Sequence, residues 1–186
     1  MVSRILEDLR SEHRTMRKLL DLLQHQIALV ADDRQPNGEL LLEITEYFRS
    51  YPELFHHPKE ELILRRVIDR NPDAADTLTA VEDAHDTASR DLNRFSRAVV
   101  RLLIDKDGAE DRFLSAALAF IDSERRQLAW EDRQIFDLAA ESLDESAWSE
   151  IETSLNCLAY PEAGRAVPTP FGPIGVAVGH WRNQAA

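Results

Sequence analysis

The stretch Phe55-His56-His57-Pro58-Lys59-Glu60-Glu61 offers histidine and glutamate side chains that are four residues apart. On a helix this spacing places both side chains on one face, where they can bind the same metal ion. A second stretch, Gln127-Leu128-Ala129-Trp130-Glu131-Asp132, repeats the spacing with glutamine in the place of histidine. The two stretches indicate a metal site built on helices, provided that the surrounding segments are helical.

Four long amphipathic patterns surround these stretches. In each of them apolar residues recur at steps of three and four, which is typical of a helix with one buried face. The first pattern begins after Ser3 and is broken at residues 32–38, and the second runs from about Glu39 to Arg70. The third ends at residues 105–108, and the fourth runs from about Ala109 to Glu141. Because Pro52 and Pro58 fall inside the second pattern, we expect a kink or a short break near Tyr51.

The sequence after the fourth pattern predicts one more helix and then a tail. Ser142-Leu143-Asp144-Glu145 resembles a capping box for a short fifth helix that reaches about Leu158. Beyond it lie four prolines and scattered glycines. The predicted fold class is all-α: an up-down-up-down four-helix bundle with a short fifth helix over residues 1–158, and an extended tail over residues 159–186.

Composition excludes several classes of partner. The formal net charge of −12 argues against nucleic-acid binding, which depends on neutralising phosphates with Lys and Arg. It would also repel anionic membranes, and no apolar run is long enough to span one. With a single cysteine and no apolar segment typical of a signal peptide, the sequence favours a cytoplasmic protein.

Each of the four patterns carries polar side chains where its apolar stripe faces inward. His13 follows Leu9 by four residues, and His85 follows Val81 by four. The second and fourth patterns place polar side chains at the inward positions His56, Glu60, Glu124, Gln127 and Glu131. A buried carboxylate without a partner is very costly, so Glu60 and Glu131 need a cation or a hydrogen-bonded network.

Each of these residues also has an interpretation that involves no metal site. A single inward histidine can be an ordinary core residue, and an error in helical phase could move one glutamate to the rim. The same interruption in four helices favours a shared site. A mixed set of imidazoles and carboxylates suits iron, manganese or zinc.

These residues resemble the hemerythrin-like family, the HHE cation-binding domains, over about residues 3–141. The resemblance rests on Glu12-His13, on residues 51–61, on His85 and on residues 130–136. It implies a four-helix bundle around a non-haem di-iron centre in which two glutamates bridge the metal ions. The implied ligands are His13, His56, Glu60, His85 and Glu131.

Two positions leave alternatives open. His57 and Glu61 share the four-residue spacing, but His56 and Glu60 are preferred because Glu60 opens a Glu-Glu pair as Glu131 opens Glu-Asp. His57 and Glu61 would then lie outside the ligand set, where they could orient a ligand. Gln127 stands where the family pattern has histidine, so one metal would be under-coordinated, more open to an external ligand, or absent.

Glu124, one turn before Gln127, could substitute in part for the missing histidine. The other interpretation of Glu124 is a side chain that faces solvent or pairs with the neighbouring Arg125 or Arg126.

The leading hypothesis is an iron protein, di-iron or mononuclear, that binds or senses dioxygen, nitric oxide or peroxide, or stores iron. Manganese and zinc are the other candidate metals. No separate general base or nucleophile is evident, which disfavours hydrolysis, whereas an oxidase or peroxidase side activity is compatible with such a centre. The alternative is a metal-free bundle that acts as a protein interaction module. A ferritin-like di-metal oxidase, which pairs each glutamate with a histidine three residues later, ranks last.

Overall fold

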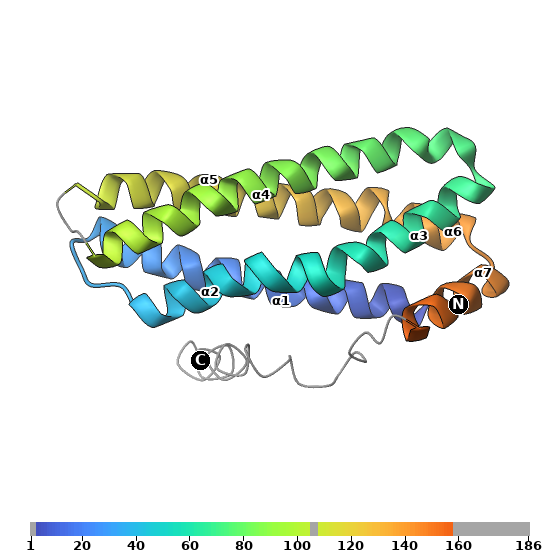
Figure 1. The fold of residues 1–186 in the computed structure, drawn as a ribbon, viewed down its shortest axis with the longest axis horizontal. Coiled ribbons are helices and arrows are strands. Elements are labelled where there is room, and N and C mark those ends of the chain that lie inside the picture. The colour runs from blue at the N-terminus through green and yellow to red at the C-terminus, as the bar shows by residue number, and fades with distance from the viewer. Residues whose placement is uncertain (1–2, 105–107, 158–186) are drawn as a thin grey trace.

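Four long helical rods lie side by side in the computed structural model, which describes residues 3–104 and 108–157 (Figure 1). The elements are, in chain order, α1 (Arg4–Ala31), α2 (Gly38–Tyr51), the π-helical turn η1 (Pro52–His56), α3 (His57–Arg70), the 3-10 turn η2 (Pro72–Ala74), α4 (Ala75–Ile104), α5 (Glu110–Gln134), α6 (Phe136–Ser142) and α7 (Glu145–Cys157). The described residues contain no strand. The predicted all-α class is confirmed, while the predicted tail over residues 159–186 lies outside the described residues.

The rods close into a bundle. Successive rods run in opposite directions: α1, then α2 with α3, then α4, then α5 with α6 (Figure 1). Each rod packs on two others, because α1 contacts α2 and α5, while α4 contacts α2 and α5. This is the predicted up-down-up-down arrangement. None of the helices in the described part of the chain is both long and apolar enough to span a membrane.

Side-chain caps fix the first two helix starts. Ser3 Oγ accepts a hydrogen bond from the backbone N–H of Ile5 at 3.3 Å, and Asn37 Oδ1 accepts one from Leu40 at 3.1 Å. Such caps satisfy backbone donors that have no partner inside the helix. The Asn37 backbone N–H also donates to Gln26 Oε1 at 2.7 Å, which ties the turn before α2 back onto α1.

The kink expected near Tyr51 is the π-helical turn η1. Its first residue, Pro52, has no backbone N–H, and the His57 N–H reaches back five residues to the Pro52 carbonyl. This wider turn shifts the helical phase between α2 and α3. The His56 side chain is 1 % exposed as a result, and that of His57 is 18 % exposed.

The fourth rod is interrupted where the sequence predicts a continuous helix. The α5 helix ends at Gln134, and α6 begins at Phe136. Backbone hydrogen bonds from Ile135 to Glu131 and from Ala139 to Ile135 continue through the junction. Since no proline or glycine lies near Ile135, the sequence carries no signal for this break.

The start of α7 also differs from the prediction. Asp144 Oδ1 accepts the backbone N–H of Ala147 at 2.9 Å, so Asp144 caps this helix in place of Ser142. Both residue types are good N-caps, and the aspartate stands directly before the first helical residue. The described part of α7 ends at Cys157, and the predicted end at Leu158 lies just outside the described residues.

The core divides into two apolar clusters, one toward each end of the bundle. One includes Met16, Phe48 and Leu128, and the other includes Leu9, Ile63 and Ile135. Members of the two clusters flank His13 on α1, His56 and Glu60 on the second rod, and Glu131 on α5. Glu124 and Gln127 stand before Leu128, among members of the first cluster. A polar layer therefore separates the two halves of the core.

Candidate metal centre

Four buried side chains from four elements meet in this polar layer. They are His13 of α1, His56 of η1, Glu60 of α3 and Glu131 of α5, and one ligand atom from each lies within 4.8 Å of all the others. Nε2 of His13 and Nε2 of His56 are 2.9 Å apart. Oε1 of Glu60 lies 3.6 Å from His13 Nε2 and 3.2 Å from His56 Nε2. Oε2 of Glu131 lies 3.4 Å from His13 Nε2.

His85 of α4 approaches the same two carboxylates from the other side. Its Nε2 lies 3.4 Å from Oε1 of Glu131 and 3.7 Å from Oε2 of Glu60. Each glutamate thus turns one oxygen toward His13 or His56 and the other toward His85. The structure therefore brings together all five residues that the resemblance implies as ligands.

The donor set fits a cation. Both oxygens of Glu60 and Oε2 of Glu131 are buried and have no hydrogen-bond partner within the described residues. Buried polar atoms are normally satisfied, so these three carboxylate oxygens need an explanation. A metal ion between the carboxylates and the imidazoles would satisfy these oxygens.

The electrostatics of the cluster also favour bound positive charge. Burial alone would raise the pKa of Glu60, but His56, His13 and His85 hold it well below the usual range. Burial disfavours charged imidazoles, yet Glu60 and Glu12 raise the pKa of His56 to about 10. The side chains of Glu131 and Glu60 likewise raise the pKa of His85 to about 9 against the effect of burial. A bound metal ion would take the place of these protons.

A further carboxylate contacts Nδ1 of His13, the ring nitrogen that points away from the cluster. Asp132 Oδ1 lies 2.9 Å from Nδ1 of His13, and Arg17 forms an ion pair with the other oxygen of Asp132. Arg17 also donates to the backbone carbonyl of Leu128 at 3.1 Å. Asp132 therefore orients the imidazole so that Nε2 faces the cluster.

Glu12 plays the same part for His56. Its Oε2 lies 2.8 Å from Nδ1 of His56, and its other oxygen pairs with Lys59. Burial opposes ionisation of Glu12, but its hydrogen bond to His56 leaves the pKa lowered. Helical periodicity does not predict the orienting role of Glu12 and Asp132. The available signal was their position, since each stands next to an implied ligand in the chain.

The alternative pair His57 and Glu61 does not join the cluster. His57 stacks on His85 with ring centroids 3.7 Å apart, and its Nδ1 lies 3.5 Å from Glu53 Oε1. Glu61 is exposed and forms an ion pair with Arg65. Of the two pairs with four-residue spacing, His56 and Glu60 are the pair that converges with His13 and Glu131.

Gln127 faces the cluster. It is buried, and its Nε2 donates to Oε1 of Glu131 at 2.9 Å, while its own Oε1 has no partner within the described residues. Glu124 is also buried, in contrast to the solvent-facing alternative, and Arg125 pairs with Asp21 instead. Burial and then the charge of Glu131 raise the pKa of Glu124 to about 8.

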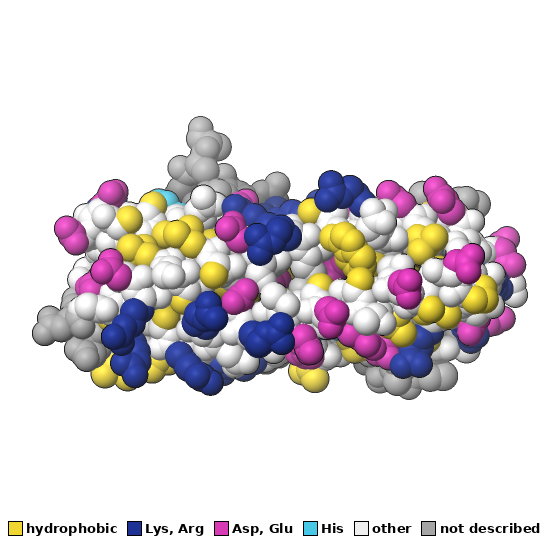
Figure 2. Space-filling model, turned by 90° about the horizontal axis from the view of Figure 1, so that it is seen from above, with side chains coloured by type: hydrophobic (Ala, Val, Ile, Leu, Met, Phe, Trp, Pro, Cys, Tyr) yellow, Lys and Arg dark blue, Asp and Glu magenta, His cyan; other side chains and the backbone are white. Residues whose placement is uncertain are grey.

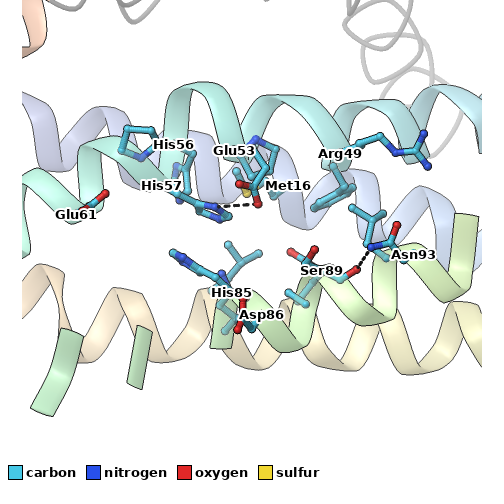
Figure 3. Close-up of a pocket in the computed structure, with 18 residues that line it drawn as sticks. Met16, Arg49, Glu53, His56, His57, Glu61, His85, Asp86, Ser89 and Asn93 are labelled. Atoms are coloured by element: carbon cyan, nitrogen blue, oxygen red, sulfur yellow. Dashed lines mark hydrogen bonds and ion pairs between the residues drawn. The ribbon is translucent and has the colours of Figure 1, made fainter. Parts of the chain in front are cut away.

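A pocket of about 460 Å³ opens beside the cluster, between the second rod and α4 (Figure 3). Its inner wall includes His56, His85, Glu124 and Gln127, whereas His13, Glu60 and Glu131 do not line it. Figure 3 shows His57 of α3 across from His85 of α4 in this pocket. The His85 side of the cluster is therefore the side that faces open space.

The spacing typical of a ferritin-like oxidase, Glu-x-x-His, occurs twice in the chain, in Glu53 with His56 and in Glu82 with His85. The carboxylates of both pairs are exposed: Glu53 has a side chain that is 61 % exposed, and Glu82 also lies at the surface. Neither glutamate joins its histidine in the buried cluster, so the ferritin-like arrangement is not formed.

The family model described as hemerythrin HHE cation binding domain matches residues 4–139. The match extends from the start of α1 into α6 and includes every residue of the cluster. A search of curated proteins gives no match, and neither does a search of solved structures.

Proposed function

The chain belongs to the hemerythrin family of HHE cation-binding domains, and from this premise we propose that its buried cluster holds a pair of iron ions and offers one of them to a small ligand. The terminal ligands would be His13, His56 and His85. Glu60 and Glu131 would bridge the two ions. The ligand would be dioxygen, nitric oxide or a peroxide.

This proposal rests on the way in which each carboxylate turns its two oxygens toward different histidines. One oxygen of each glutamate lies near His13 or His56, and the other lies near His85. Two neighbouring positions, each between both carboxylates, are what a bridged pair of ions requires. The oxygens of Glu60 support the same conclusion, because a metal-free bundle would have to keep the imidazoles of His56 and His85 protonated inside the core to satisfy them.

The two positions differ in their ligands. One has two imidazoles, from His13 and His56, and the other has the single imidazole of His85 with Gln127 beside it. An amide oxygen is a weak neutral ligand, and the amide nitrogen of Gln127 already donates to Glu131. The ion next to His85 would therefore keep an open coordination position toward the pocket.

When bound, iron supplies redox and Lewis-acid chemistry for reversible binding of such ligands. The chain contributes oriented imidazoles, through Asp132 and Glu12, and a pocket whose size suits a small molecule. The donors of the cluster suit one or two ions, which favours binding or sensing over storage of iron as a mineral. We further propose that the bundle over residues 1–158 forms the metal-binding unit.

Metal analysis of protein expressed with ample iron, together with optical spectra before and after air or nitric oxide, tests this function. We expect about two iron ions per chain and charge-transfer bands that change on exposure to the gas. A protein that retains no metal under these conditions would contradict the proposal. One ion per chain with an unchanged gas response would restrict it to a mononuclear centre.

A further inference from the structure

One exposed stripe of α4 is acidic in its first half and basic in its second half. The stripe consists of Asp76, Asp83, Asp86, Arg90, Arg94, Arg97 and Arg101. Steps of three, four and seven residues keep these side chains on one side of the helix, and all of them are exposed. In the view of this side of the bundle, Lys and Arg gather mostly in the left half and Asp and Glu mostly in the right half (Figure 2). We call these seven residues the α4 charge stripe.

Most charged side chains of the α4 charge stripe form no ion pair within the described residues. Neither the three aspartates nor Arg97 and Arg101 form an ion pair there. Arg94 approaches Asp91 only at 3.9 Å, and Arg90 donates to the hydroxyl of Thr87. In a chain with a net charge of −12, such a concentration of unpaired arginines is unusual.

A groove of about 720 Å³ runs along the basic half, between α4 and α5. All four arginines of the stripe line it, together with Arg112 of α5, and Asp111 is the one acidic residue among its lining residues. Such a groove fits acidic side chains. A long polyanion is a poor occupant, because the acidic half of the same stripe would repel it.

The register of the charges points to a second copy of the chain. Asp83 and Arg94 have the same midpoint on α4 as Asp76 and Arg101, namely the peptide bond between Ala88 and Ser89. A two-fold axis at this point would pair two antiparallel α4 helices. Asp76 and Asp83 would then lie opposite Arg101 and Arg94 of the other copy, and symmetry would form each of these two pairs twice. Asp86 would lie opposite Asp91 and would contribute no attraction.

We propose that the α4 charge stripe binds a second copy of this chain in an antiparallel, two-fold arrangement, with Asp76 opposite Arg101 and Asp83 opposite Arg94. Exposed ion pairs contribute little each and are screened by salt. The association is therefore weak, and it strengthens as the salt concentration falls. The proposal is independent of the metal centre, because the four residues that form the proposed pairs neither belong to the cluster nor line the pocket beside it.

Sedimentation equilibrium of the full chain over a range of concentrations, at low and at high salt, tests the proposal. The wild type is expected to form dimers at low salt. Two charge reversals, R94E/R101E and D76R/D83R, should each weaken the association constant roughly tenfold or more, because like charges then face each other. The matched control is R14E/K18E, which reverses two exposed charges on α1 and should leave the association unchanged.

A mixture of the two reversed proteins gives the sharpest result. In the mixed dimer every reversed residue faces an opposite charge, so the mixture should associate more tightly than either variant does alone. A far-ultraviolet circular dichroism spectrum identical to that of the wild type shows that each variant is folded. A wild type that stays monomeric at low salt would overturn the proposal, as would a mixture that does not associate. Binding of inorganic pyrophosphate to a wild type that stays monomeric would make the groove an anion site instead.

Discussion

Asp132 on α5 holds the outer nitrogen of His13 on α1, with Oδ1 and Nδ1 2.9 Å apart. Glu12, the residue before His13 in the chain, holds the outer nitrogen of His56 on η1 in the same way. Carboxylates that flank the implied ligands therefore act across helices, each on the imidazole of another rod. This crossing links the orientation of both imidazoles to the packing of α1 against its neighbours.

Loss of an orienting carboxylate should weaken metal binding while the fold persists. For Asp132→Asn and for Glu12→Gln we expect metal affinity to fall roughly 10- to 100-fold, because a neutral amide oxygen is a weaker acceptor for Nδ1–H than a carboxylate and leaves the imidazole a poorer ligand. Competition with a coloured chelator measures the change. The control is Asp137→Asn, which alters an exposed carboxylate in α6 that pairs with Arg10. Equal affinities in all three variants and the wild type would show that the outer carboxylates do not act on the metal.

The choice between the two overlapping His and Glu pairs can be tested directly. Glu60 is buried within the cluster, whereas Glu61 is exposed and pairs with Arg65. We expect Glu60→Ala to abolish most of the bound iron, and Glu61→Ala to leave the iron content unchanged. Iron content per chain after purification is the measurement. If Glu61→Ala loses the iron and Glu60→Ala keeps it, the ligands are His57 and Glu61.

Gln127→His should tighten metal retention. Gln127 already lies against Glu131, and an imidazole is a far better ligand for iron than an amide oxygen. The rate of iron loss to a chelator should fall, and the binding of nitric oxide should weaken if the new imidazole fills the open position. Gln134→His, at the exposed end of α5, controls for an added histidine. An unchanged rate of loss would mean that residue 127 does not reach the ion.

Helical periodicity predicted the bundle and the inward direction of His13, His85 and Glu131, because those residues stand in regular helices. It could not choose between His56 and His57, since the π-helical turn alters the phase at that point. The break at Ile135 has no proline or glycine to mark it. Contacts between rods, such as His13 with Asp132, depend on how the helices pack, and a pattern within one helix carries no information about them.

Metal removal should lower the thermal stability of the wild type. A ligand that binds only the folded state at a concentration of about a hundred times its Kd adds about 2.7 kcal/mol to the free energy of unfolding. For a domain of this size we therefore expect a drop in Tm of roughly 5–10 °C on chelation. Differential scanning calorimetry with and without the chelator measures it.

The Glu60→Ala protein is the matched control for this experiment, because it lacks a carboxylate that would lie between both ions. Its Tm should not respond to iron or to chelation. A wild-type Tm that is equally indifferent would mean that the ions do not stabilise the folded bundle. A response that survives in Glu60→Ala would instead place the stabilising ion elsewhere on the chain, since the loss of Glu60 removes two of the buried oxygens that make this layer suited to a cation.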